Sequence, residues 1–314
     1  MYRRPGVYQA AFLYKLLTFA ALFTNNNSME IAEGILFAIL WASATAATKF
    51  GIHSVEPLLL ACIRFLAVGG LLMGFVYGIK GKQHRLPNKK ECKHLFILGL
   101  LNITIYIIAF VIAVKLVSAG LVSLFNAMPP LVITLLSAVW LKRAVKPLEW
   151  LGIGLAIVGL AIAAIPNLKS SHATLGGIVI LLIGQIALAT GSTYFASIKL
   201  DMSRLAINAW QTAIGGVLMI PLVLANYKNI YLVADANFYW SLSWLIVPVS
   251  IIAYSLWMHL LHKDTVKAGM WLLVTPVLGY IMAVILLHEK VTAYAIAGAI
   301  LVVTGVFIAK RIKS

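Results

Sequence analysis

The 314-residue chain is 62% hydrophobic and 11% charged, with a mean hydropathy of +0.98. Soluble domains are about half apolar and about a quarter charged, so this composition predicts an integral membrane protein and excludes a chain folded around one soluble core. The formal net charge is +16, but the basic residues lie in short gaps between apolar runs. A nucleic-acid partner would need a basic face on a folded domain, so we expect none.

Residues 1–28 form a poorly defined N-terminal extension. Residues 6–24 are moderately apolar but are interrupted by Gln9 and Lys15. Arg3 and Arg4 resemble the start of a signal peptide, yet no small-residue cleavage pattern follows. We interpret this segment as an extension outside the core, with Met29 as an alternative start. A helix lying on the membrane surface is the second interpretation.

Ten apolar runs follow, each about as long as the roughly 20 residues that a helix needs to span the hydrocarbon core. Inside lipid every backbone polar group needs a partner within the protein, which favours helices over isolated strands. The sequence therefore predicts an all-α membrane protein of ten transmembrane helices. The predicted helices are 31–50, 57–79, 94–114, 118–141, 147–166, 175–198, 203–225, 239–261, 265–287 and 291–310.

The lysines and arginines predict an orientation. With residue 30 in the cytoplasm, 16 of them lie in the inner segments 80–93, 142–146, 199–204, 263–267 and 310–313. Five lie at the outer ends: Lys49, Lys115, Lys169, Lys228 and Lys290. Cytoplasmic loops carry an excess of basic residues, so we expect a multi-pass protein of the cell membrane with both termini in the cytoplasm.

An internal repeat relates the two halves at a shift of 146 residues. Identical residues fall at Pro130 and Pro276, at Gly152 and Gly298, and at Gly159 and Gly305, among eight identities within one ungapped stretch of 34 residues. We divide the chain into the extension 1–28, a first five-helix repeat at 29–166 and a second at 167–314. Five is odd, so the repeats are inverted, an architecture typical of transporters whose halves rock around a central site.

Several residues on this frame resemble the EamA type of the drug/metabolite transporter superfamily, over about residues 31–311. They are Trp41, Lys49, Arg64, Phe65, Pro130, Leu151, Gly152, Thr275, Pro276, Leu287, His288, Glu289, Gly298 and Gly305. The resemblance implies transport of a small metabolite, such as an amino acid or a related amphipathic compound, commonly outward. It also permits a lipid-linked sugar flippase. Arg143 stands where the repeat predicts a partner of Glu289, so the acidic turn survives only in the second half.

Polar and aromatic residues recur at helical spacing and predict a central cavity. Polar groups at membrane depth usually face the bundle interior or a water-filled space, although interhelical hydrogen bonds and interfacial aromatic belts are alternatives. Stripes that include Asn102, Tyr106 and Phe110, or Ser250 and Tyr254, share one helix face. The candidate substrate-binding residues are Trp41, Arg64, Tyr106, Asn126, Gln185, Gln211, Tyr254 and Trp271.

Arg64 lies about eight residues inside the second predicted helix. A guanidinium at this depth needs a partner or water. A substrate carboxylate and a structural group of a neighbouring helix are equally good interpretations of that partner. Pro130 and Pro276 remove helical hydrogen bonds, so we expect hinges, with static curvature as the alternative. Gly152 and Gly298 are expected to allow close helix packing.

The function that these patterns predict is a secondary transporter that exports or facilitates the passage of small organic metabolites by alternating access. No phosphate-binding nucleotide motif is present, so transport would be facilitated diffusion or coupled to an ion. No paired intramembrane carboxylates or zinc-protease motif points to a membrane enzyme, and the two cysteines suggest no metal or other cofactor. The expected partners are the solute and membrane lipid, and the oligomeric state, a homodimer included, stays open.

Overall fold

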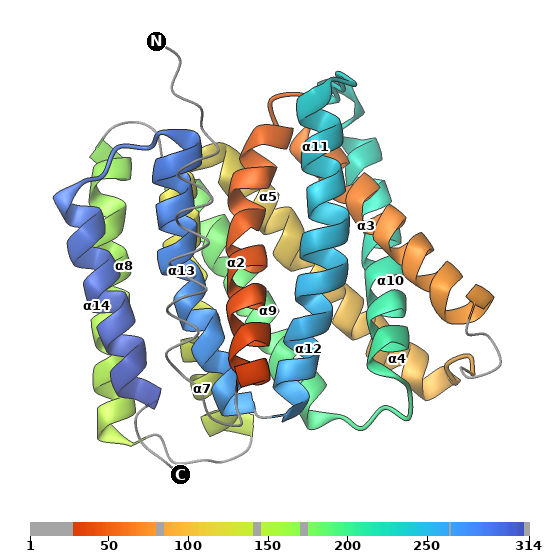
Figure 1. Ribbon diagram of the computed structural model, residues 1–314, viewed down its shortest axis with the longest axis horizontal. Coiled ribbons are helices and arrows are strands. Elements are labelled where there is room, and N and C mark those ends of the chain that lie inside the picture. The colour runs from red at the N-terminus through yellow and green to blue at the C-terminus, as the bar shows by residue number, and fades with distance from the viewer. Residues whose placement is uncertain (1–27, 80–84, 141–145, 170–174, 264, 311–314) are drawn as a thin grey trace.

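The computed structural model describes residues 28–79, 85–140, 146–169, 175–263 and 265–310 (Figure 1). The interpretations of residues 1–27 and of Arg143 lie outside these ranges. The helices of the first half are α2 (Ser28–Gly51), α3 (Pro57–Met73) with its π-helical continuation η1 (Gly74–Ile79), α4 (Lys89–Leu98), η3 (Gly99–Ile105), α5 (Tyr106–Leu116), α6 (Ala119–Phe125), α7 (Met128–Trp140) and α8 (Pro147–Lys169). Those of the second half are α9 (Leu175–Ser197), α10 (Arg204–Ala225), η4 (Tyr227–Asn229), α11 (Ala236–Trp244), η5 (Leu245–Ala253), α12 (Tyr254–Lys263), α13 (Thr265–Leu287) and α14 (Ala293–Lys310).

The protein is all-helical in the described ranges, where an isolated antiparallel bridge between Val55 and Leu232 is the sole β pairing. Among the described residues, six helices are long and apolar enough to cross a membrane, judged by length and composition. They are Ile31–Gly51, Pro57–Ile79, Lys89–Leu116, Leu175–Ser197, Arg204–Ala225 and Ala236–Leu260. The apolar helices Trp150–Ile165, Val274–Leu287 and Ala293–Gly305, within α8, α13 and α14, are shorter than these six. Helices occupy every predicted range, but a total of ten membrane crossings stays a prediction.

Two helices begin earlier than hydropathy predicts, because polar caps extend them. Asn88 accepts a hydrogen bond from the Glu91 backbone N–H, and the Glu91 carboxylate accepts one from the Asn88 N–H. This capping box starts α4 at residue 89, before the apolar run. Asp235 likewise accepts from the Phe238 N–H at 2.9 Å and starts α11 at residue 236.

The predicted helix 118–141 is divided rather than kinked at its prolines. Ser118 caps α6, and the chain leaves the helix in a turn at Asn126 and Ala127. Pro129 and Pro130 then lie in the first turn of α7, where a missing N–H removes no helical hydrogen bond. Pro276, by contrast, lies inside the continuous helix α13.

A π-helical segment interrupts corresponding helices of the two halves. The segment η3 begins at Gly99 and η5 begins at Leu245, which is the spacing of the internal repeat. In η3 the Thr104 hydroxyl donates to the Gly99 carbonyl at 3.2 Å, and in η5 Pro248 supplies no N–H. Each segment ends at a tyrosine, Tyr106 or Tyr254, whose N–H donates five residues back. Such wide turns often occur at functional sites.

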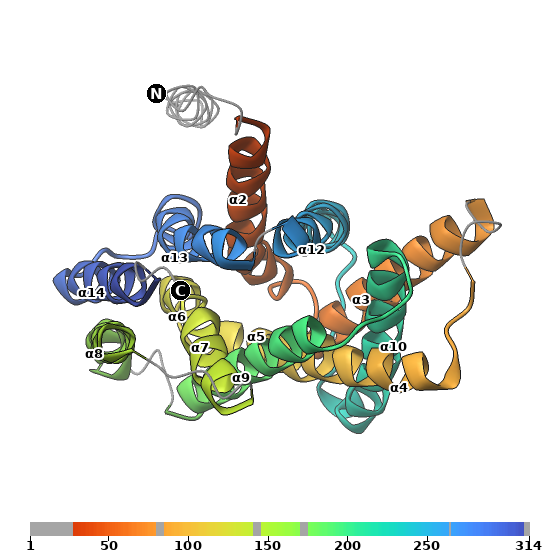
Figure 2. The same cartoon turned by 90° about the horizontal axis from the view of Figure 1, so that it is seen from below.

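Glycines bring the last helices of the two halves, α8 and α14, into backbone contact at one end of the bundle (Figures 1 and 2). A Cβ atom on Gly159 would lie 2.7 Å from the Gly298 carbonyl oxygen, and one on Gly305 would lie 2.5 Å from that of Gly152. These pairs run in opposite directions along the two helices, so α8 and α14 are antiparallel. The repeat relates Gly152 to Gly298 and Gly159 to Gly305, and the contacts join Gly159 to Gly298 and Gly152 to Gly305. This exchange of partners is what a two-fold relation between inverted repeats requires.

Candidate functional site

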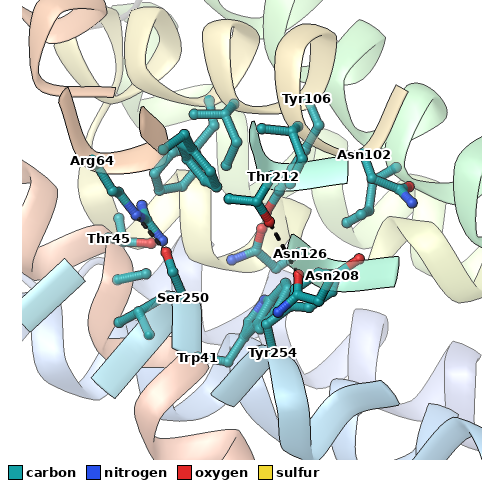
Figure 3. Close-up of a pocket in the computed structure, with 17 residues that line it drawn as sticks. Trp41, Thr45, Arg64, Asn102, Tyr106, Asn126, Asn208, Thr212, Ser250 and Tyr254 are labelled. Atoms are coloured by element: carbon teal, nitrogen blue, oxygen red, sulfur yellow. Dashed lines mark hydrogen bonds between the residues drawn. The ribbon is translucent and has the colours of Figure 1, made fainter. Parts of the chain in front are cut away.

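A cavity lies between the two halves and is lined by residues of both. The first half contributes α2, α3, η3, α5 and the Asn126 cap of α6, and the second contributes α9, α10, η5 and α12. The volume of this central cavity is about 40 Å³. The space is narrow, so an organic solute requires its walls to move apart. Figure 3 shows the polar and aromatic side chains that face it.

Arg64 on α3 is the charged residue among the described residues that line the central cavity. Its side chain is buried, its Nε donates to the Ser250 hydroxyl of η5 at 2.8 Å, and its guanidinium lies 4.7 Å from the centre of the Phe65 ring (Figure 3). No carboxylate of the described residues that line the cavity neutralises it. A cation at this depth costs at least about 2.5–3.5 kcal/mol, which makes an anionic partner favourable.

Asn126 reaches the cavity from the break between α6 and α7. The Gln185 Nε2 of α9 donates to the Asn126 Oδ1 at 3.1 Å, so the amide of the first half is held by the second. Gln185 itself is buried behind Asn126, and its Oε1 has no hydrogen-bond partner among the described residues. A buried acceptor without a partner is costly. Because Gln185 does not line the cavity, a solute there would meet Asn126 rather than Gln185.

A second polar group lies on α10 and α12. Asn208 Oδ1 accepts from the Thr212 hydroxyl at 3.1 Å and from Gln211 Nε2 at 3.3 Å, and the same Gln211 nitrogen donates to the Tyr254 hydroxyl at 2.8 Å. These donors fix which end of the Asn208 amide is the oxygen. Its Nδ2 then remains without a partner in the described part of the chain. Asn208 therefore offers an N–H donor at the cavity wall.

Aromatic rings close the cavity toward the ends of α2 and α12 that the charge pattern predicts to be cytoplasmic. The Trp41 and Tyr254 rings line the cavity with centres 6.3 Å apart, and Phe37 lies 5.4 Å from both Trp41 and Trp257. We call Phe37, Trp41, Tyr254 and Trp257 the aromatic floor. Beyond it, Glu33 lies 3.6 Å from His259, and Arg204 lies 3.3 Å from the other nitrogen of that ring.

The opposite end is closed by α6 and its contacts with the second half. Both carboxylate oxygens of Glu289 accept hydrogen bonds from the start of α6, at 2.6 Å from the Ala119 nitrogen and 2.9 Å from the Gly120 nitrogen. Lys49 donates to the Val117 carbonyl at 3.1 Å. The first turn of a helix has unpaired N–H groups, and Glu289 satisfies two of them. The residue before it, His288, has a φ of 55°, a left-handed conformation that is uncommon outside glycine.

Five of the eight candidate binding residues line the cavity, namely Trp41, Arg64, Tyr106, Asn126 and Tyr254. The other three differ from the prediction. Gln185 and Gln211 are buried behind the wall and act on Asn126 and Tyr254. The Trp271 indole packs against Gly34 and the aromatic floor and does not line the cavity. Gly34 leaves room for the indole because it has no Cβ atom.

Thr212 lines the cavity without having been predicted. It lies one helical turn after Asn208, and this spacing is the signal in the sequence that could have found it. Asn102 and Ser250 belong to the predicted polar stripes and line the cavity, as does Asn208. The candidate hinge Pro130 lies in the helix after the break, and Gly152 and Gly298 lie in the contact between α8 and α14.

Comparison with known proteins connects this architecture to transport. The EamA-like transporter family matches residues 29–165 and again 175–310, so the chain contains two EamA repeats. The inner membrane transporter YedA of Escherichia coli K12 is 30% identical over 79% of this chain and 80% of its own. A probable amino-acid metabolite efflux pump of Salmonella typhimurium is 27% identical over 87% of this chain and 92% of its own.

Other comparisons extend over nearly the whole chain. An Archaeoglobus fulgidus protein named as a transporter is 24% identical over 88% of this chain and 96% of its own. A solved crystal structure with 18% identity covers 88% of this chain and 95% of its own with a TM-score of 0.58, and it shares the fold. The apolar helices and the transporter relatives together identify a multi-pass membrane protein. The chain belongs to the EamA-like transporter family.

Proposed function

We propose that the protein is a secondary transporter of the cell membrane that carries small organic metabolites by alternating access around the central cavity. The observation that carries this proposal is that both halves supply the walls of one polar and aromatic cavity. Two inverted halves that share a site can expose it to either face by rocking. The proposal includes ten membrane crossings and both termini in the cytoplasm, in agreement with the distribution of lysine and arginine.

The closed ends of the cavity support this mechanism. The aromatic floor lies toward the face that we predict to be cytoplasmic, and α6 lies toward the predicted outer face. Opening to one side requires the floor rings to separate, and opening to the other requires α6 to move from Glu289. The aromatic rings and amides around the cavity suit a solute with an apolar body and polar ends. The amino-acid efflux named for the Salmonella relative is an example of such a solute class, which we adopt for the first tests.

Flux into liposomes tests the proposal. We expect the purified chain to move at least one member of a labelled panel of amino acids, organic acids, amines and neutral amides. Asn126→Ala should lower affinity about tenfold, the effect of losing one hydrogen bond of about 1.4 kcal/mol. Ile183→Ala, at an exposed position on α9, is the matched control and should leave flux unchanged. If correctly folded protein moves no member of the panel, the proposal fails.

A further inference from the structure

A second hollow lies on the other side of α6 and carries an excess of positive charge. Its volume is about 790 Å³, and its lining includes Lys49, Lys115, Lys290 and Glu289. We call it the basic hollow. Both oxygens of Glu289 already accept backbone N–H groups of α6, and Lys49 uses one of its N–H groups on the Val117 carbonyl. Three ammonium groups thus share one carboxylate whose hydrogen-bonding positions toward α6 are occupied.

The sequence places these three lysines at the predicted outer ends of different helices, and the fold gathers them. Lys49 lies in the last turn of α2, Lys115 lies in the last turn of α5, and Lys290 precedes α14. Among the five lysines of the predicted outer face, Lys228 is not part of this lining and lies near the ring of Tyr227 at 6.0 Å. The basic hollow is therefore a specific cluster rather than a general property of that face.

The helix α6 separates the basic hollow from the central cavity. Ser118, Leu121 and Leu124 line the hollow, whereas Asn126 at the other end of α6 lines the cavity. The cavity holds the buried Arg64, whose Nε donates to the Ser250 hydroxyl (Figure 3) and whose guanidinium lies against the Phe65 ring. No carboxylate lies among the described residues that line the cavity. Two cationic sites thus lie in succession, one on each side of a single helix that is fully buried.

We propose that the solute is a small organic carboxylate with an apolar body, and that it binds at two sites: at Arg64 in the central cavity and in the basic hollow on the outer side of α6. This inference rests on the proposed transport function. At the first site the guanidinium fork takes the carboxylate, with the aromatic rings around the apolar body. At the second, the lysines hold it by charge alone, and salt weakens this binding.

Binding of matched probes to the full chain in a zwitterionic detergent tests the first site. The probes are 3-phenylpropanoate, its neutral amide and 3-phenylpropylamine, which differ only in the polar group. We expect the carboxylate alone to raise Tm, with about a tenfold or greater loss of affinity in Arg64→Gln. Arg64→Lys keeps the charge without the fork and should retain part of the preference for the carboxylate, which guards against a folding defect in the glutamine variant. Equal binding of the three probes overturns the assignment.

The second site is tested by flux from the outer face in zwitterionic liposomes. Lys115→Gln with Lys290→Gln should raise KM for the carboxylate severalfold at low salt and little at high salt, whereas the matched Lys228→Gln should not. An effect that appears only when anionic lipid is present would assign the hollow to a lipid headgroup and overturn the solute site. If neutral or cationic solutes are carried instead, transport stands and the carboxylate inference falls. If no solute moves at all, the proposed function itself fails.

Discussion

Gln211 is buried, yet it is the residue that orients the cavity-facing hydroxyl of Tyr254. Its Nε2 donates to that hydroxyl at 2.8 Å and to Asn208 Oδ1 at 3.3 Å, and no face of Gln211 lines the cavity. A side chain of this kind determines the direction of two neighbours without meeting the solute. The energetic reason is that an unpaired polar atom in a buried site is more costly than a made hydrogen bond is favourable.

Gln211→Leu should therefore lower both stability and transport. The leucine fills a similar volume but donates to neither neighbour, and we expect the free energy of unfolding to fall by about 1–3 kcal/mol. Thermal unfolding in detergent and flux in liposomes measure the two effects. Ile183→Ala is the control for transport, and Thr212→Val, which removes the other donor to Asn208 but leaves the Tyr254 bond intact, separates the two hydrogen bonds of Gln211. Wild-type KM in Gln211→Leu would contradict this positioning role.

Asp235 makes the loops at the predicted outer face sensitive to acid. Its carboxylate accepts from the Phe238 N–H at 2.9 Å and from the Ser54 hydroxyl at 2.8 Å, and these bonds lower its pKa. A carboxyl whose pKa is lower in the folded state contributes stability that is complete above its unfolded pKa of about 3.9 and is lost as the pH falls through the folded value. The bond to Ser54 joins the turn after α2 to the start of α11.

We expect the Tm of the wild type to fall more than that of Asp235→Asn between pH 6 and pH 3.5. Asparagine keeps an acceptor for the cap but does not titrate, so the difference between the two proteins isolates this carboxyl. All other acidic groups are common to both. Parallel decreases of Tm in the two proteins would contradict the assignment.

Among the elements, α6 is held at its start by a residue of the other half. It has seven residues, a break follows it at Asn126, and Glu289 holds its first two N–H groups. One end of the helix reaches the central cavity and one end meets the loop before α14. A movement of α6 therefore changes the cavity wall and the outer surface together.

Glu289→Ala should destabilise the protein by about 1–3 kcal/mol, because two N–H groups lose their acceptor. Glu289→Gln should have a smaller effect, since its amide keeps one oxygen. Thermal unfolding gives the order, and alkylation of a cysteine at Leu124 in a background without Cys62 and Cys92 reports the opening of α6. Lys290→Ala, next in sequence but with no bond to α6, is the control. Equal losses at positions 289 and 290 would refute the role of Glu289.

Hydropathy was sufficient for the locations of the helices but not for their interruptions. The range around Asn102 is equally apolar whether its backbone is α-helical or π-helical, so no composition pattern indicates η3. Near residue 126 the prediction uses Pro130 as the point of a hinge, whereas the helix breaks before the prolines. Pro129 and Pro130 lie in the first turn of α7, where proline removes no helical hydrogen bond. Caps at Asn88 and Asp235 were readable from residue type, but they lie outside the apolar runs that set the predicted ends.

The candidate site was predictable to the extent that one helix determines its own inward face. Tyr106 and Asn126 follow from that face, and they line the cavity. The position of a side chain relative to a neighbouring helix does not follow from spacing. Gln185 is covered by Asn126, and Trp271 turns to the flat surface of Gly34, because contacts between helices decide these positions.

At the scale of the whole molecule, the orientation predicted from the charge pattern assigns each closed end of the cavity to one side of the membrane. Cys92 is exposed near the start of α4, in a segment predicted to be cytoplasmic, and Cys62 is buried. A membrane-impermeant maleimide should therefore label Cys92 in inverted vesicles but not in intact cells. Lys228→Cys, placed in a variant without Cys92, should show the opposite pattern. Labelling of Cys92 from outside would reverse the orientation.

The matched π-helical segments also show what geometry the two halves have in common. A wide turn of this type closes hydrogen bonds between residues five apart instead of the four of the surrounding α-helix. The turns begin at Gly99 and Leu245, at the same register of each repeat, although one contains Thr104 and Asn102 and the other Pro248. The wide turn therefore begins at the same register of both repeats although its residues differ, so the two halves share the geometry of this turn and not its side chains.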